Sequence, residues 1–153
     1  MRALALALVL AACGEDGTGA RPSAAFAGTW ISDPTQSTIV CGSDRQTVDE
    51  HAVQWAYVAT DDTTISLSTF GGTCTEAFSV ADGKMQAAAG QTCMAHGMVD
   101  GVAVDSTYRV ITDVYTLTSP TEMTQERVEY DTFVSDHGTL GCTATLSRHF
   151  TKQ

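Results

Sequence analysis

The chain has 153 residues, a formal net charge of −10 at pH 7, and 43% hydrophobic but only 17% charged residues. This length predicts a single domain, and the composition is too apolar for a disordered chain. With eight basic residues against eighteen acidic ones, the chain lacks the basic surface that a nucleic-acid-binding protein needs.

The first twelve residues predict export from the cytoplasm. Arg2 precedes an apolar run from Ala3 to Leu10 that is too short to span a membrane. Small residues follow, which is typical of a secretory signal peptide. The sequence Leu10-Ala11-Ala12-Cys13 resembles the lipobox of bacterial lipoproteins, which implies cleavage before Cys13 and lipidation of its thiol. An ordinary signal peptide, with Cys13 incidental, is the alternative.

The lipobox resemblance also implies a domain organisation and a location. Residues 1–12 are predicted to be a lipoprotein signal peptide, and residues 13–25 the lipidated cysteine and a flexible tether. Residues 26–153 are predicted to form the folded domain. Two or three acyl chains would hold the protein stably on a membrane. Gly14 follows the cysteine, and the sorting rule that this resembles implies the outer membrane of a Gram-negative bacterium.

Four further cysteines predict two disulfides. An even number of cysteines in an exported protein favours a disulfide framework. A zinc site is the alternative, but zinc prefers closely spaced C-x₂₋₄-C pairs, and these cysteines are far apart in the sequence. The four residues are Cys41, Cys74, Cys93 and Cys142.

One pairing follows from a predicted hairpin. Asp82-Gly83 is a strong signal for a two-residue hairpin turn. That turn places Cys74 opposite Gln91, two residues short of Cys93, and on the same face of the sheet. A bulge within residues 87–90 would bring Cys74 and Cys93 together. By elimination, the second disulfide joins Cys41 to Cys142.

The domain is predicted to be all-β. Apolar residues alternate with polar or small ones in residues 53–57, 65–67 and 142–150, and turn signals separate these runs. Residues 107–119 and 122–135 are predicted to form two long strands around Pro120. Eight to ten strands in a domain of this size predict a small antiparallel up-and-down barrel.

The start of the domain carries a family resemblance. Gly28-Thr29-Trp30 resembles the Gly-x-Trp signature of the lipocalins and related calycins. In that family the tryptophan closes one end of the barrel, and an arginine from the last strand lies across it. Arg148 shares a face with Leu146 and Phe150, so the resemblance implies that Arg148 stacks on Trp30. The sequences GGTC at 71–74 and GQTC at 90–93 also resemble small Cys-rich bacterial lipoproteins of unknown function.

The sequence carries no recognisable catalytic or metal-binding motif. G-x-S-x-G, H-E-x-x-H, P-loop and dinucleotide-binding patterns are all missing, and no calcium loop occurs. The histidines are scattered, and the acidic residues of the segment 122–131 are predicted to keep a long strand soluble. We therefore predict a protein that is not an enzyme and has no cofactor, catalytic residue or metal. The histidines are His51, His96, His137 and His149.

Two functions remain open at this stage. The bulky inward residues favour a filled barrel that acts as a structural or protein-interaction module, for example an inhibitor of another envelope protein. The alternative is a lipocalin-like carrier of a small hydrophobic ligand. Its cavity would be lined by Trp55, Tyr57, Leu67 and Phe78.

Overall fold

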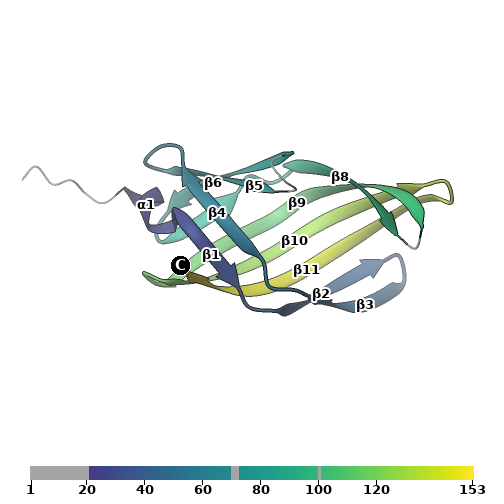
Figure 1. Cartoon of the computed structure of the whole chain (residues 1–153), viewed down its shortest axis with the longest axis horizontal. Helices are drawn as coiled ribbons and strands as arrows, with labels where there is room; N and C mark the ends of the chain where they lie inside the picture. The colour runs from purple at the N-terminus through teal and green to yellow at the C-terminus, as the bar shows by residue number, and fades with distance from the viewer. Residues whose placement is uncertain (1–20, 70–72, 100) are drawn as a thin grey trace, which may run out of the picture.

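The computed structural model describes residues 21–69, 73–99 and 101–153 (Figure 1). One short helix precedes a series of antiparallel strands. The elements are α1 (Pro22–Phe26), β1 (Gly28–Ser32), β2 (Thr35–Cys41), β3 (Asp44–Glu50), β4 (Gln54–Ala59), β5 (Thr64–Thr69), β6 (Cys74–Ala81), β7 (Lys84–Ala87), β8 (Thr92–Val99), β9 (Val102–Ser119), β10 (Glu122–Ser135) and β11 (Gly138–Lys152).

Eight of these strands close into a barrel. They follow the order β1-β4-β5-β6-β7-β9-β10-β11, and β1 pairs with both β4 and β11, which completes the ring. All pairings are antiparallel, which confirms the predicted small up-and-down barrel. The described part of the chain holds eleven strands, more than the eight to ten expected, because β2, β3 and β8 lie outside the ring.

The three longest strands continue beyond the barrel and form what we call the sheet extension. β8 pairs with the first half of β9, and β2 of the β2–β3 hairpin pairs with the middle of β11. Figure 1 shows β9, β10 and β11 running past the shorter barrel strands, with β8 along one side and β2–β3 along the other. The molecule is therefore a short barrel whose one end opens onto a curved sheet.

The predicted hairpin between β6 and β7 is confirmed. Asp82 and Gly83 have φ angles of 50° and 70°, as a type I′ turn requires. The turn sets Val80 opposite Met85, in the expected register.

Both predicted disulfides are present, Cys41–Cys142 and Cys74–Cys93. The route to the second one differs from the prediction, because no bulge carries β7 along β6 to Cys93. β7 ends at Ala87, the chain turns at Gly90, and β8 pairs with β9 instead. Beyond the end of β7, the side-chain amide of Gln91 forms the hydrogen bonds to the β6 backbone that a longer β7 would form. It accepts a hydrogen bond from the Ala77 N–H and donates one to the Ala77 carbonyl, both at 2.8 Å.

Helix α1 packs against the closed end of the barrel. Ser23 and Phe26 are buried, and the Ser23 hydroxyl donates to the Asp61 carbonyl at 2.6 Å. The predicted tether therefore ends earlier than expected, because residues 21–25 are held against the barrel. Residues 13–20 lie outside the described residues. No helix in the described ranges is long and apolar enough to cross a membrane.

Trp30 has a different cation from the one predicted. Its indole N–H donates to the Phe26 carbonyl at 2.7 Å, so the ring lies beneath α1. Lys152, opposite Trp30 in the β1–β11 register, places its ammonium 5.2 Å from the centre of the Trp30 ring. Arg148 instead lies over Trp55. Residues that pair directly on antiparallel strands point to the same face of the sheet. Lys152, and not Arg148, is the residue of β11 that pairs with Trp30.

Candidate functional site

The closed half of the barrel is filled by aromatic side chains. Tyr115 is fully buried, and its ring makes edge contacts with Tyr57 and Phe78, each at a centroid distance of 5.6 Å. Phe150 continues this cluster toward Trp55, with ring centroids 5.3 Å apart. The aromatic rings leave no room for a ligand at this level, as the bulky inward residues predict.

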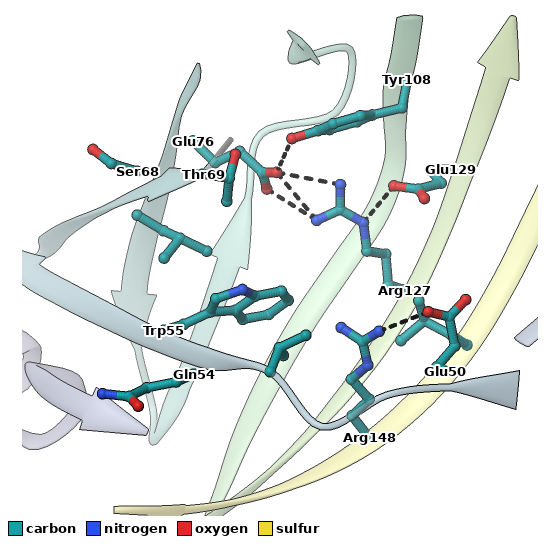
Figure 2. A pocket seen from close by; sticks show the side chains of 13 residues that line it. Glu50, Gln54, Trp55, Ser68, Thr69, Glu76, Tyr108, Arg127, Glu129 and Arg148 are labelled. Atoms are coloured by element: carbon teal, nitrogen blue, oxygen red, sulfur yellow. Dashed lines mark hydrogen bonds and ion pairs between the residues drawn. The ribbon is translucent and has the colours of Figure 1, made fainter. Parts of the chain in front are cut away.

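Above this core, the open half of the barrel contains a cavity of about 570 Å³. This volume lies within the range of small-molecule sites. The cavity lies at the level where the barrel meets the sheet extension, and Figure 2 shows the side chains around it. Its apolar lining residues are Val53, Trp55, Leu67 and Leu146, and its charged ones are Glu50, Glu76, Arg127, Glu129 and Arg148, with Leu146 directly opposite Arg127 in the β10–β11 register.

The structure divides the four predicted cavity residues into two pairs. Trp55 and Leu67 line the cavity. Tyr57 and Phe78 do not, because they lie deeper, in the aromatic core, with 2% and 1% of their surface exposed. The prediction of a cavity-lining role for Tyr57 and Phe78 is therefore wrong. Lipidation of Cys13 falls outside the described residues.

Strand β10 brings the charges into the barrel. Residues opposite each other on antiparallel strands share a face, and Gln125 is opposite the buried residues Tyr115 and Arg148. Arg127 and Glu129 follow at intervals of two, so they also face inward. The prediction that Glu129 serves only to keep a strand soluble is wrong, because β10 is a central strand and Glu129 faces the cavity.

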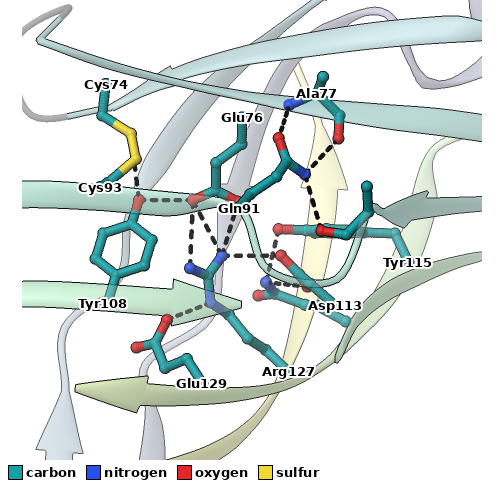
Figure 3. Close-up of polar contacts among 12 residues, drawn as sticks. Cys74, Glu76, Ala77, Gln91, Cys93, Tyr108, Asp113, Tyr115, Arg127 and Glu129 are labelled. Carbon is teal, nitrogen blue, oxygen red and sulfur yellow. Dashed lines mark hydrogen bonds and ion pairs between the residues drawn. A yellow bond between two sulfur atoms is a disulfide. The ribbon is translucent and has the colours of Figure 1, made fainter. Parts of the chain in front are cut away.

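Arg127 is the centre of a buried ion-pair network (Figure 3). Its Nη1 lies 3.0 Å from Glu76 Oε2 and 2.9 Å from Asp113 Oδ2, and its Nε lies 2.6 Å from Glu129 Oε2. The Tyr108 hydroxyl donates to Glu76 Oε1 at 2.7 Å, and the Tyr108 ring lies 5.0 Å from the Arg127 guanidinium carbon. Arg127 is thus held on all sides, by three carboxylates and one ring.

The network contains more negative than positive charge. Burial raises the pKa of Asp113 to about 6, although Arg127 and the Gln125 amide act in the opposite direction. Burial and the hydrogen bond to Glu76 raise the pKa of the Tyr108 hydroxyl, which therefore remains a donor. Asp131 follows Glu129 on the same face of β10. Burial and the charge of Glu129 raise the pKa of Asp131 to about 7.

The raised pKa of Asp131 predicts a pH-dependent stability. An acid whose folded-state pKa is above its unfolded value binds its proton more tightly in the folded state. Its contribution to stability is therefore lost as the pH rises through about 4 to 7. Asp131→Asn should stabilise the protein at pH 8 by about 1–2 kcal/mol, less than the full shift implies, because solvent screens a half-buried carboxylate.

Urea unfolding at pH 5 and pH 8 measures this effect. The stability of Asp131→Asn should depend less on pH than that of the wild type, and the two should nearly agree at pH 5. Asp44→Asn, at an exposed position at the start of β3, is the matched control and should leave the pH dependence unchanged. Equal pH dependence in the wild type and Asp131→Asn would contradict this assignment.

Arg148 is the second buried arginine of the cavity, with 7% of its side chain exposed. Its guanidinium carbon lies 5.4 Å from the centre of the Trp55 ring. Its Nη2 donates to Glu50 Oε2 at 3.3 Å. The Arg148 Nε–H is buried and has no hydrogen-bond partner among the described residues, which is costly for a charged group.

Comparison of the chain with protein-family models, curated proteins and solved structures finds no match. In the part of the chain that the structure describes, no group of three or more His, Cys, Asp or Glu side chains is placed to hold a metal ion. The cavity is therefore interpreted from its own residues.

Proposed function

We propose that the protein is a non-enzymatic lipoprotein of the bacterial cell envelope that binds a small amphipathic molecule in the mouth of its barrel. The observation that carries this proposal is the cavity of about 570 Å³ between the packed aromatic core and the sheet extension. A barrel built only as a rigid support could be filled at this level as it is at the level of Tyr115. The cavity instead is lined by both apolar and charged side chains.

The mixed lining of the cavity defines the kind of ligand. Val53, Leu67 and Leu146 offer apolar contact to the body of a molecule, and arginine and glutamate side chains lie beside them. A purely hydrophobic ligand would exclude water from these ion pairs and leave the Arg148 Nε–H without an acceptor, at a cost in free energy. A molecule with an apolar body and a polar group at one end suits the cavity better. This narrows the lipocalin-like carrier hypothesis to an amphipathic ligand.

The location of the protein is inferred from its N-terminal sequence. The lipobox-like residues before Cys13 support cleavage there and a lipid anchor, and Gly14 supports the outer membrane. A tether of residues 13–20 would connect the anchor to Pro22, where α1 begins at the closed end of the barrel. In this arrangement the closed end of the barrel is the end attached to the anchor.

A second candidate function is binding to a basic envelope protein. The face of the sheet extension opposite Tyr108 exposes Met94 and Met98 on β8 and Val134 on β10, each more than 40% exposed. Exposed apolar side chains grouped on one face are typical of interaction sites. The net charge of −10 favours a partner of opposite charge.

Native mass spectrometry of the full-length protein, extracted in detergent from a bacterial envelope, tests the first proposal. We expect a chain that begins at Cys13 and carries acyl groups, together with a small molecule that dissociates on collisional activation. An unmodified N-terminus would refute the lipid anchor. A bare protein that also fails to take up any amphipathic probe would refute the binding function.

A further inference from the structure

The two arginines of the cavity differ in how their hydrogen-bond donors are used. A guanidinium has five N–H donors. Arg127 donates to Glu76, Asp113 and Glu129 through all three of its nitrogens. Arg148 donates to Glu50 through Nη2 alone, and its Nε–H has no partner in the described part of the chain. Every nitrogen of Arg127 therefore has an acceptor, whereas the buried Nε–H of Arg148 has none among the described residues.

The surroundings of Arg148 suit an incoming acceptor. Its guanidinium lies against Trp55, which holds it in place at the cavity wall, as Figure 2 shows. Its single partner, Glu50, is the last residue of the edge strand β3, and 32% of the Glu50 side chain is exposed. The contact with Glu50 is longer than those of Arg127 with its carboxylates. The other Glu50 oxygen, Oε1, accepts a hydrogen bond from the Ser37 hydroxyl at 2.8 Å, so a ligand can replace the Oε2 contact with Arg148 while Glu50 stays bonded to Ser37.

We propose that Arg148 binds the carboxylate group of an organic acid whose apolar body lies against Val53, Leu67 and Leu146. This inference rests on the proposed function and names the ligand class. A carboxylate matches the planar fork of a guanidinium and can accept two hydrogen bonds from it. The ligand takes over the contact that Glu50 makes in the structure, and it provides an acceptor for the Arg148 Nε–H.

The main alternative is a positively charged ligand, such as an amine. Glu76 and Glu129 also line the cavity and would attract an amine. Both oxygens of Glu76 already accept hydrogen bonds from Arg127, and Oε1 accepts a further one from Tyr108. Glu129 is paired with the Arg127 Nε. Among the charged side chains of the cavity in the described part of the chain, the buried donor left without a partner is the Arg148 Nε–H, so the geometry favours an acid over an amine.

A titration with three probes of equal chain length tests the ligand class. Octanoate, octan-1-ol and octylamine share one apolar body and differ in the charge of the head group. Binding to the oxidised protein is followed by ¹H–¹⁵N NMR through its two tryptophan indole signals. Only the Trp55 signal should shift, because Trp30 is fully buried and bonded to Phe26. We expect octanoate to bind about tenfold or more tightly than either other probe.

Two variants assign the effect to Arg148. Arg148→Met should weaken octanoate binding about tenfold and leave octan-1-ol binding nearly unchanged. Glu50→Gln removes the competing carboxylate and should tighten octanoate binding about threefold to tenfold, and an unchanged Trp30 signal would show that each variant is folded. Asp49→Asn is the matched control for Glu50→Gln. Asp49 is its neighbour on β3 and bonds to Gln36, so octanoate affinity should not change.

The outcomes separate this inference from the proposed function. If the three probes bind equally well, or octylamine binds best, the carboxylate inference fails while the binding function survives. If octanoate binds but Glu50→Gln does not tighten it, Arg148 is not the group that holds the carboxylate. If none of the probes shifts the Trp55 signal, the inference and the binding function both fail.

Discussion

Replacing Arg127 by methionine is expected to lower the free energy of unfolding by about 3–5 kcal/mol. The change removes the one cation that pairs with Glu76, Asp113 and Glu129 among the residues that the structure describes. The Glu76 and Asp113 side chains are 2% and 0% exposed, so they have little contact with solvent once the guanidinium is lost. Removing one partner of a buried ion pair leaves an uncompensated charge, which costs this much in other proteins.

Urea unfolding at pH 7.5 measures the loss, and two further variants make the cause visible. Arg109→Met removes an exposed arginine from the outer face of β9, where it lies over Tyr130, and should change stability by less than about 0.5 kcal/mol. Adding Glu76→Gln and Asp113→Asn to Arg127→Met should restore much of the stability, because no buried charge then remains unpaired. A loss below about 1 kcal/mol for Arg127→Met would show that the network is hydrated.

The cost of Arg127→Met should also depend on pH. The pKa of Asp113 is raised to about 6 even with Arg127 present, and it should rise further without it. At pH 5 Asp113 is therefore largely protonated in the variant, and one of the three unpaired charges disappears. We expect a smaller difference from the wild type at pH 5 than at pH 7.5. A difference that does not change with pH would argue against Asp113 as part of the penalty.

The sequence predicts this barrel because its strands carry local signals. Alternation of inward and outward residues identifies β5 and β11, and Asp82-Gly83 identifies the turn of the β6–β7 hairpin. The bounds of β10 agree with the prediction, and β9 begins at Val102, five residues earlier than expected. Each of these features depends on neighbours in the chain, and such features can be predicted from one sequence.

The charged residues of the cavity could not be predicted from such local signals. From Thr124 to Asp131, polar residues occupy both faces of β10, so alternation does not show which face is buried. Met123 is the signal that could have identified the buried face. It is apolar and faces inward, and Arg127 and Glu129 follow it at even spacing on the same face of β10. The ion pair itself could not be predicted, because Arg127 on β10 contacts Glu76 on β6 only once the distant strands have paired.

The wrong cation for Trp30 and the wrong route to the correctly predicted Cys74–Cys93 disulfide have the same origin. The resemblance to lipocalins assigned Arg148 to Trp30, but the register of β1 with β11 places Lys152 there. The hairpin argument brought Cys93 toward Cys74 along β6, but the pairing of β8 with β9 brings it there. In both cases the sequence indicated the right region of the barrel, but the residue or strand that makes the contact is set by pairing between strands that are distant in the sequence.

The two disulfides should contribute unequally to stability. Cys41–Cys142 closes a sequence separation of 101 residues, whereas Cys74–Cys93 closes one of 19. In the chain-entropy model these loops are worth about 4.7 and 3 kcal/mol, because the longer crosslink removes more freedom from the unfolded chain. We therefore expect the double variant Cys41→Ala with Cys142→Ala to lose more stability than Cys74→Ala with Cys93→Ala, as measured by urea unfolding.

Ligand binding should show the opposite order. Cys74–Cys93 fixes β6 to β8 beside Tyr108, whose hydroxyl is bonded to Glu76 in the cavity wall. Cys41–Cys142 joins β2 to β11 in the sheet extension, and neither cysteine lines the cavity. Loss of the short disulfide should therefore weaken octanoate binding more than loss of the long one, compared at a urea concentration where both variants remain folded. If the long disulfide dominates both measurements, the cavity depends on global stability and not on the local position of Tyr108.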